Sequence, residues 1–283
     1  MTKMKTVQIG DIRVSNADPM VIIAGPCALE SRDCALKIAD HLAAITMDLE
    51  IPYIFKASFD KANRTSIDAK RGVDLDNALK IFDEIKKTYG CPVITDVHEP
   101  YQCDIVAAVV DILQIPAFLC RQTDLLIAAA KTGKAINIKK GQFLAPWDMK
   151  NVYKKVTQFG NENVTLCERG TCFGYNKLIT DMRSLKIMGD FGYPVIFDAT
   201  HSVQEPGGLG TASGGNRDHI ELLTRAALSV GVAGVFVETH YDPANAFSDG
   251  PNMVPLHVMK DFLISMKRFD ELSKNSDYLD MSC

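Results

Sequence analysis

The sequence predicts one α/β domain, residues 1–283, folded as a (β/α)8 barrel with a short N-terminal β-hairpin. Eight short apolar segments alternate with amphipathic stretches whose apolar residues recur at helical spacing. The apolar segments are hydrophobic throughout, which is typical of parallel strands covered on both faces. Eight such units favour a closed barrel over an open doubly wound sheet, and no Gly-x-Gly-x-x-Gly follows the first segment.

The predicted elements follow one another from residue 21 onward, after a hairpin that turns near Gly10 and Asp11. The predicted strands are Val21–Ala24, Pro52–Phe55, Pro92–Thr95, Ile112–Ile115, Ala135–Ile138, Val164–Cys167, Val195–Phe197 and Gly234–Val237. The predicted helices are Cys34–Leu49, Leu75–Tyr89, Leu125–Lys131, Met149–Phe159, Leu178–Met188, His219–Val230 and Val258–Leu272. The chain has no low-complexity linker, so we expect a single domain.

Composition and charge restrict the class of protein. The chain is 47% hydrophobic, which is enough for a full-sized core. A formal net charge of -4 and a pI near 5.9 argue against a nucleic-acid or anionic-membrane partner. The N-terminus has no apolar core of signal-peptide length, and no run of apolar residues is long enough to span a bilayer. We therefore expect a cytoplasmic protein whose eight scattered cysteines, which form no CxxC pair, are mostly reduced.

Polar side chains follow the predicted strands at the ends where a barrel places its functional residues. Phe55–Ser66 is the densest such segment, with three cations and several hydroxyl or amide groups directly after a buried strand. A solvated loop would explain one such segment, but not polar residues at every strand end. We therefore expect one shared active site. Its candidates at the strand ends are Lys56, Lys61, Asp96, His98, Gln114, Lys139, Arg169 and His201.

The cations fall into two groups, which favours two anionic substrates or one substrate with charge at both ends. One group should face the barrel mouth: Lys56, Lys61, Lys139 and Arg169. The other group lies further out along the loops: Arg64, Arg71 and Arg121. For Arg71 and Arg121 a surface ion pair is an equal alternative.

A second set of side chains has the chemistry of a divalent-metal site. Its members are Cys27, His201, Glu238 and Asp249. One thiolate, one imidazole and two carboxylates can bind Mn, Fe, Zn or Co as the divalent ion, and this mixture does not select among them. The alternative for Cys27 is a small buried side chain. His98 and His240 fit supporting or core positions, and Gly207–Gly215 fits a mobile loop beside the substrates.

Seven segments together resemble the 3-deoxy-D-manno-octulosonate 8-phosphate synthase (KDO-8-phosphate synthase) family over nearly the whole chain. They are IAGPC at Ile23–Cys27, FKASFDKANRTS at Phe55–Ser66, TDVHE at Thr95–Glu99, IPAFLCRQTD at Ile115–Asp124, NIKKGQF at Asn137–Phe143, ERGTCFGY at Glu168–Tyr175 and DATHSVQ at Asp198–Gln204. The resemblance implies a (β/α)8 barrel and a homotetramer. It also implies a transferase that condenses phosphoenolpyruvate with arabinose 5-phosphate, releases phosphate and supplies lipopolysaccharide biosynthesis.

The resemblance also implies roles for particular residues. Lys56, Lys61, Lys139 and Arg169 would hold phosphoenolpyruvate. The sugar phosphate would be bound by Asn63, Arg64 and Thr65, with Arg121 reaching in from a neighbouring subunit. The polar middle of the substrates would face Asp96, His98 and Gln114, and the substrate-binding set would also include Arg71 and Phe118.

Two features bear on the subclass that the resemblance implies. The related synthase that uses erythrose 4-phosphate, 3-deoxy-D-arabino-heptulosonate 7-phosphate synthase, carries Lys-Pro-Arg-Thr where this chain has Ala62–Thr65, so Asn63 favours the five-carbon sugar. The metal-independent class has Asn in place of Cys27, which makes this chain resemble the metal-dependent class. Gly250-Pro251 after Asp249 is closer to the metal-independent pattern, although all four ligands are present.

Two further functions compete with this reading. A Schiff-base aldolase would need a lysine desolvated in an apolar pocket, whereas the lysines here lie among anion-binding groups. A non-catalytic sugar-phosphate-binding barrel would be expected to lack some ligands or cations, and none is missing.

Overall fold

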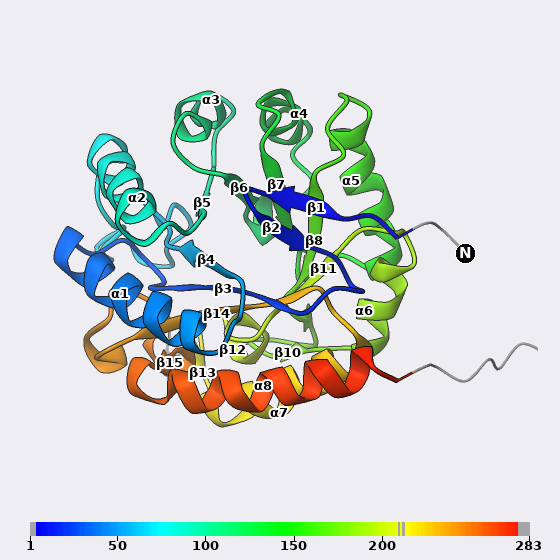
Figure 1. Cartoon of the computed structure of the whole chain (residues 1–283). Coiled ribbons are helices and arrows are strands. Elements are labelled where there is room, and N and C mark those ends of the chain that lie inside the picture. The colour runs from blue at the N-terminus through cyan, green and yellow to red at the C-terminus, as the bar shows by residue number, and fades with distance from the viewer. Residues whose placement is uncertain (1–3, 209, 211–212, 277–283) are drawn as a thin grey trace, which may run out of the picture.

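The computed structural model describes residues 4–208, 210 and 213–276, and within them eight parallel strands close into a barrel (Figure 1). In barrel order the strands are β3 (Val21–Gly25), β4 (Tyr53–Lys56), β5 (Val93–Asp96), β6 (Ile112–Ile115), β7 (Ala135–Lys139), β8 (Val164–Glu168), β11 (Val195–Asp198) and β14 (Gly234–His240). Pairing of β14 with both β3 and β11 closes the ring. The predicted fold class is confirmed.

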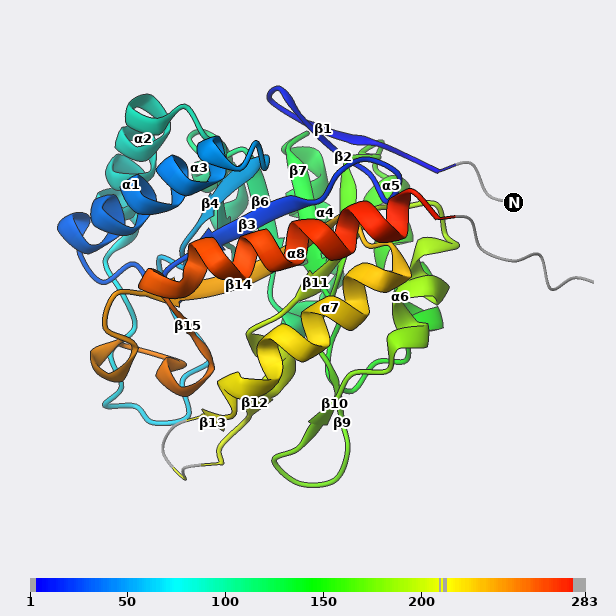
Figure 2. The same ribbon diagram turned by 60° about the horizontal axis from the view of Figure 1, so that its bottom comes forward.

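Helices surround the barrel, and Figure 2 shows two of them, α7 and α8, side by side on its outer face. The helices are α1 (Arg32–Asp48), α2 (Leu75–Tyr89), α3 (Gln102–Ala107), α4 (Thr123–Lys131), α5 (Met149–Thr157), α6 (Met182–Gly189), α7 (Ile220–Val230) and α8 (Met259–Lys274). Short 3-10 turns are η1 (Ala117–Leu119), η2 (Pro146–Asp148), η3 (His201–Val203), η4 (Arg217–His219), η5 (Pro243–Asn245), η6 (Gly250–Asn252) and η7 (Leu256–Val258). The larger core fills the space between helices and strands.

The N-terminal hairpin is confirmed, with β1 (Val7–Ile9) and β2 (Ile12–Val14) joined through Gly10 at a φ of 55°. A positive φ favours glycine, which explains the turn at this position. The apolar side chains of the hairpin pack with inward-facing residues of the barrel strands in a second hydrophobic cluster. The hairpin therefore covers the N-terminal end of the barrel and leaves the opposite end for the site.

Strand periodicity explains why that opposite end is polar. Side chains two residues apart on a strand point to the same face. Ile54, Ile94, Ile112 and Ile196 belong to the inner cluster beside the hairpin. Two positions further along the same strands, still facing inward, come polar side chains. These are Lys56, Asp96, Gln114 and Asp198, all buried.

Two parts of the predicted element order differ from the structure. The predicted helix Leu178–Met188 begins only at Met182, where the Asp181 side chain accepts a hydrogen bond from the Arg183 backbone N–H and caps it. Its first residues instead form β10 (Leu178–Ile179), which pairs with β9 (Thr171–Cys172). The six-residue helix α3 was not predicted, because so short a segment has little periodicity.

The remaining short strands lie in the loops of the site end: β12 (Gln204–Glu205), β13 (Gly214–Gly215) and β15 (Val254–Pro255). The predicted mobile loop Gly207–Gly215 lies partly outside the described residues, at positions 209, 211 and 212. All seven cysteines within the described ranges are free thiols, as predicted. In the part of the chain that the structure describes, no helix has both the length and the apolar character needed to cross a bilayer.

Candidate active site

A hollow of about 410 Å³ opens at the C-terminal ends of the barrel strands. Most of the predicted site residues line it: Lys56, Lys61, Asn63, Arg64, Thr65, Asp96, His98, Gln114, Phe118, Lys139, Arg169, His201 and Asp249. Residues from distant parts of the sequence meet here because the barrel directs the C-terminal ends of its strands, and the loops that follow them, to one face. The structure therefore brings the strand-end candidates into one cavity.

The floor of the hollow is built from buried ion pairs. Lys56 Nζ lies 2.6 Å from Glu238 Oε1, and Lys139 Nζ lies 2.7 Å from Asp198 Oδ2. Lys61 Nζ is 3.8 Å from the same Glu238 oxygen. Burial alone would lower the pKa of Lys139, but the anionic groups around it, Asp198 first among them, together outweigh burial and hold that pKa above its usual value. Lys139 is therefore a fixed cation at neutral pH.

Arg169 supplies a donor that the protein itself does not use. Its side chain is only 4% exposed. Nη2 donates to Gln204 Oε1 at 2.8 Å, whereas Nη1 is buried without a hydrogen-bond partner among the described residues. A buried guanidinium N–H without a partner is costly, and a phosphate or carboxylate oxygen would satisfy it. This geometry supports anion binding at Arg169.

A chain of hydrogen bonds crosses the barrel interior toward Asp96. Thr165 Oγ1 donates to Asn137 Oδ1 at 2.9 Å, and Asn137 Nδ2 donates to Gln114 Oε1 at 3.1 Å. Gln114 Nε2 then donates to Asp96 Oδ1. Ser58 Oγ donates to the other oxygen of Asp96 at 2.5 Å. Every hydrogen bond in this series is donated toward Asp96, which is therefore held as a carboxylate that accepts on both oxygens.

Asp96 makes acid stability testable. Burial alone would raise the pKa of Asp96, but the neighbouring cationic groups, Lys56 and Lys61 first among them, together outweigh burial and hold that pKa at about 2. A depressed carboxylate pKa contributes stability that is present above the unfolded value of 3.8 and is lost as pH falls toward 2. We expect urea denaturation at pH 6 and pH 3 to show a loss for the wild type that exceeds the loss for Asp96→Asn by about 1 kcal/mol. Equal losses in the two proteins would contradict the assignment.

Three of the four predicted metal ligands converge at the hollow, which one of them, Asp249, lines. One donor atom each from Cys27, Glu238 and Asp249 lies within 4.8 Å of the other two, and Cys27 Sγ is 3.2 Å from Asp249 Oδ2. His201 lies beside them, with Nε2 at 3.6 Å from Glu238 Oε2. Burial raises the pKa of Cys27 well above its usual value, and the charge of Glu238 adds to this effect. The free thiol is therefore protonated. A bound cation would favour its thiolate form.

The donors fit a divalent cation. Glu238 Oε2 is buried and makes no hydrogen bond within the described part of the chain. His201 Nδ1 lies 2.8 Å from Asp198 Oδ2, which assigns the ring hydrogen to Nδ1 and leaves the Nε2 lone pair free. A carboxylate behind a histidine is the usual support for a metal-binding imidazole. The set therefore offers free oxygen and nitrogen donors next to a thiol.

The structure places a few predicted residues away from the hollow. The Arg71 side chain is 59% exposed and forms an ion pair with Asp60, so the alternative of a surface ion pair holds for this residue. Arg121 is exposed and does not line the hollow of its own chain. His98 does line it, packs edge-on against Phe59, and has a pKa lowered by burial.

Sequence reasoning missed several side chains of the site. Gln204 Nε2 donates to Asp249 Oδ1 at 2.5 Å while its oxygen accepts from Arg169, so it joins the anion-binding and metal-ligand groups. Gln142 lines the hollow, and Ser58, a hydroxyl of the predicted segment Phe55–Ser66 that was given no role, supports Asp96. A signal for Ser58 was present, because it follows Lys56 at the two-residue spacing of a strand.

Lys140 adjoins Lys139 in sequence but has a different environment. Its fully buried Nζ donates to Thr171 Oγ1 at 2.9 Å and lies 3.4 Å from Glu168 Oε1. We expect Lys140→Met to lower the free energy of unfolding by about 3 kcal/mol, because Glu168 would stay buried without its cation. Urea denaturation measures this, with the exposed Lys150→Met as a control expected to change it by less than about 0.5 kcal/mol. Equal effects of the two variants would contradict a structural role for Lys140.

The fold and the hollow define the class of protein: a (β/α)8 barrel with buried cations and carboxylates at the C-terminal ends of its strands. A family model described as the DAHP synthetase I family matches residues 2–275. The chain therefore belongs to the DAHP synthetase I family.

Curated relatives match almost the whole chain. The 2-dehydro-3-deoxyphosphooctonate aldolase of Bartonella henselae is 63% identical over 270 residues, which cover 95% of this chain and 97% of the relative. The protein of the same name from Bartonella quintana is 63% identical over 268 residues, covering 95% and 96%. That from Brucella canis is 58% identical over 274 residues, covering 97% and 99%.

Proposed function

We propose that this chain is a transferase that condenses phosphoenolpyruvate with D-arabinose 5-phosphate and water. The products are 3-deoxy-D-manno-octulosonate 8-phosphate and phosphate, so the activity is that of a KDO-8-phosphate synthase. The observation that carries the proposal is the shared name of relatives that are 58–63% identical over nearly the full chain. The alternative that uses erythrose 4-phosphate is not favoured by these relatives.

The four inner cations account for the binding of phosphoenolpyruvate. Lys56, Lys61, Lys139 and Arg169 all line the hollow, and the unpartnered Arg169 Nη1 supports a role with the substrate's anionic oxygens. Lysine offers point charges, whereas arginine adds paired planar donors. These residues neutralise the phosphate and carboxylate and hold the substrate in a defined orientation.

The outer residues account for the binding of the sugar phosphate. Asn63, Arg64 and Thr65 line the hollow on the loop after β4. Arg64 is held in place because it donates to Phe247 O at 2.8 Å and Ser248 Oγ at 2.5 Å. The sugar phosphate would lie at this outer loop with its aldehyde directed inward. The two reactants would then meet between the two groups of cations.

The proposed chemistry joins two carbons and releases phosphate. C3 of phosphoenolpyruvate attacks the aldehyde carbon, and the aldehyde oxygen takes up a proton to become a hydroxyl. Water adds at C2 and loses a proton. The tetrahedral intermediate then expels phosphate by cleavage of the bond between C2 and the phosphate oxygen, and the C2 hydroxyl gives its proton to the departing phosphate, which leaves the 2-keto group. Buried Lys56, Lys139 and Arg169 provide preorganised positive charge where negative charge develops.

We further propose that Cys27, His201, Glu238 and Asp249 would hold a divalent metal ion. Such an ion, Mn, Fe, Zn or Co, would supply polarisation of the aldehyde or positioning of the water. The convergent Cys27, Glu238 and Asp249 donors and the free Glu238 Oε2 support this proposal. Asp198 would fix the orientation of the His201 ring through Nδ1.

A Schiff-base mechanism is disfavoured by the state of the lysines. An imine requires a neutral amine. Burial would lower the pKa of Lys61, but the carboxylates around it, Glu238 and Asp96 among them, hold that pKa well above its usual value. The pKa of Lys139 is also raised. Borohydride treatment in the presence of a carbonyl substrate is therefore expected to leave the protein mass unchanged. A mass increase equal to the reduced substrate adduct would support the aldolase alternative.

We propose a homotetramer in which Arg121 of one subunit reaches the hollow of a neighbour. Its exposed side chain does not line the hollow of its own chain, whereas Phe118, on the same loop, does so and is 52% exposed. Light scattering after size-exclusion chromatography tests the mass. We also propose that the chain forms a single domain and acts in the cytoplasm.

The experiment that tests the function is product identification. The chain is incubated with phosphoenolpyruvate labelled with 18O in the bridging position and with arabinose 5-phosphate. The proposal expects 3-deoxy-octulosonate 8-phosphate by mass spectrometry, and the label in the released phosphate because the C2–O bond breaks. Binding of both substrates without turnover would support the non-catalytic alternative, which the four inner cations that line the hollow disfavour.

A further inference from the structure

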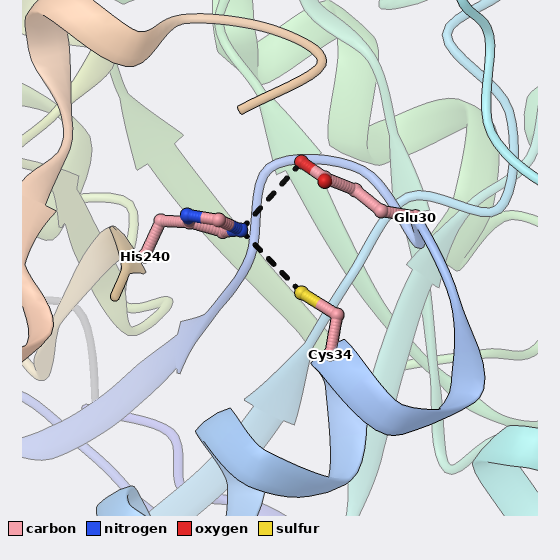
Figure 3. Close-up of side chains that lie close together, drawn as sticks. All are labelled: Glu30, Cys34 and His240. Carbon is pink, nitrogen blue, oxygen red and sulfur yellow. Dashed lines mark hydrogen bonds and ion pairs between the residues drawn. The ribbon is translucent and has the colours of Figure 1, made fainter. Parts of the chain in front are cut away.

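A second cluster of ligand-type side chains lies apart from the proposed metal ligands. Glu30, Cys34 and His240 point toward one another (Figure 3). Glu30 lies in the loop after β3, Cys34 in the first turn of α1, and His240 at the end of β14. His240 Nε2 is 3.4 Å from Cys34 Sγ and 3.8 Å from Glu30 Oε1. By composition alone, this cluster resembles a metal site.

The hydrogen bonds of His240 favour a different role. The Asp242 backbone N–H donates to His240 Nδ1 at 3.0 Å, so Nδ1 has no hydrogen of its own. In the neutral ring the hydrogen must then be on Nε2, the nitrogen that faces Glu30 and Cys34. A metal-binding histidine normally has the reverse arrangement, with its non-binding nitrogen donating a hydrogen bond. His240 therefore presents a donor to the cluster.

Glu30 uses its carboxylate to hold a loop of the active site. Glu30 Oε1 accepts a hydrogen bond from the Phe247 backbone N–H at 2.8 Å. Arg64 Nη2 donates a hydrogen bond to the carbonyl oxygen of the same residue, Phe247, at 2.8 Å. Ser248, the next residue, donates to Asp249 Oδ2 at 2.7 Å. The backbone just before Asp249 is thus held from two sides, by Glu30 through its N–H and by Arg64 through its C=O.

The same loop needs such support because of the backbone at Asp249. Its φ is 55°, in the left-handed region that non-glycine residues seldom occupy. Such a conformation persists only where surrounding contacts enforce it. Glu30 also follows Cys27 by three positions in the loop after β3. A single carboxylate therefore connects the segment that holds Cys27 with the segment that holds Asp249.

We propose that Glu30 is a positioning residue that aligns Asp249 with Cys27, so that both face one divalent cation. The inference rests on the proposed metal-dependent function. In this role His240 Nε2–H and the Cys34 sulfur complete the surroundings of Glu30 and bind no metal themselves. Removing the Glu30 carboxylate would release Phe247 and let Asp249 leave its left-handed conformation.

The test measures metal affinity rather than turnover. The full chain is stripped of metal and titrated with Zn²⁺ against a chromogenic chelator. We expect one Zn²⁺ per wild-type chain and a dissociation constant 10- to 100-fold larger for Glu30→Ala, the range for loss of a supporting contact. Glu30→Gln keeps an oxygen that can accept from Phe247, so its affinity is expected within about threefold of wild type. Hydrogen exchange at the Phe247 amide should be faster in Glu30→Ala.

Two further variants separate the possible outcomes. Cys34→Ala removes a member of the cluster that forms no hydrogen bond with Phe247, Ser248 or Asp249 among the described residues, and its Zn²⁺ affinity is expected to stay within about twofold. An equal loss in Cys34→Ala, or two Zn²⁺ per wild-type chain, would show a second metal site and overturn the inference. Asp249→Ala tests the proposed metal site itself. If Asp249→Ala weakens binding and Glu30→Ala does not, the inference fails while the metal site stands; if neither does, both fail.

Discussion

Replacing Lys139 with Ala is expected to lower kcat/KM by about a thousandfold or more. Lys139 is buried in the hollow and is held as a cation by Asp198 at 2.7 Å. Loss of one preorganised group that stabilises developing charge typically lowers turnover by about 10²- to 10³-fold. The variant would also leave the buried Asp198 carboxylate without its lysine, which disturbs His201 as well. Steady-state kinetics with both substrates measures the effect.

Controls must show that the Lys139→Ala variant is folded. Far-UV circular dichroism should match the wild type, and Lys150→Ala, on the exposed side of α5, should retain full activity. An unchanged turnover number for Lys139→Ala would remove this residue from the active site. A loss of activity matched by Lys150→Ala would point to the assay or preparation rather than to the residue.

Metal removal is expected to have a large effect on the wild type and little effect on a Cys27→Asn variant. In the wild type, Cys27, Glu238 and Asp249 present two carboxylates and a thiol within one small volume. Without a cation, neighbouring lysines compete for these carboxylates, as Lys56 already does for Glu238 at 2.6 Å. We expect EDTA to reduce wild-type turnover by about 100-fold or more and Mn²⁺ to restore it.

Cys27→Asn replaces the thiol by an amide that can donate a hydrogen bond to Asp249. Cys27 Sγ already lies 3.2 Å from Asp249 Oδ2, within reach of such a bond. The amide would then hold the carboxylate that a cation would otherwise organise. Activity that survives EDTA in this variant would show that it needs no metal. Wild-type activity that is insensitive to EDTA would instead show that the Cys27 site is not essential.

The fold was largely predictable because strand and helix periodicities are local. Ile112–Ile115 and Leu75–Tyr89 have the same bounds in the structure as in the prediction, since each has a strong apolar pattern. The pair β9 and β10 was not predictable, because two-residue strands have no periodicity. β14 extends to His240, beyond the predicted Val237, because its end pairs with β15, a contact that local sequence cannot indicate.

The location of the site was also predictable, but its internal contacts were not. Lys56 and Asp96 were found from strand ends alone, because every barrel strand directs its C-terminal end to one face. The ion pair of Lys56 with Glu238 joins strands 182 positions apart in sequence, and the bridge made by Gln204 depends on loop geometry. Glu30 gave no sequence signal, since its bond to Phe247 joins residues 217 positions apart.

The most direct test of the proposed activity compares the two sugar phosphates. Phosphate release from phosphoenolpyruvate is measured with arabinose 5-phosphate or erythrose 4-phosphate, each before and after EDTA and again after Mn²⁺. We predict that phosphate is released with arabinose 5-phosphate and not with erythrose 4-phosphate. This release should be lost with EDTA and restored by Mn²⁺. A preference for erythrose 4-phosphate would contradict the assignment and show that Asn63 does not select the five-carbon sugar.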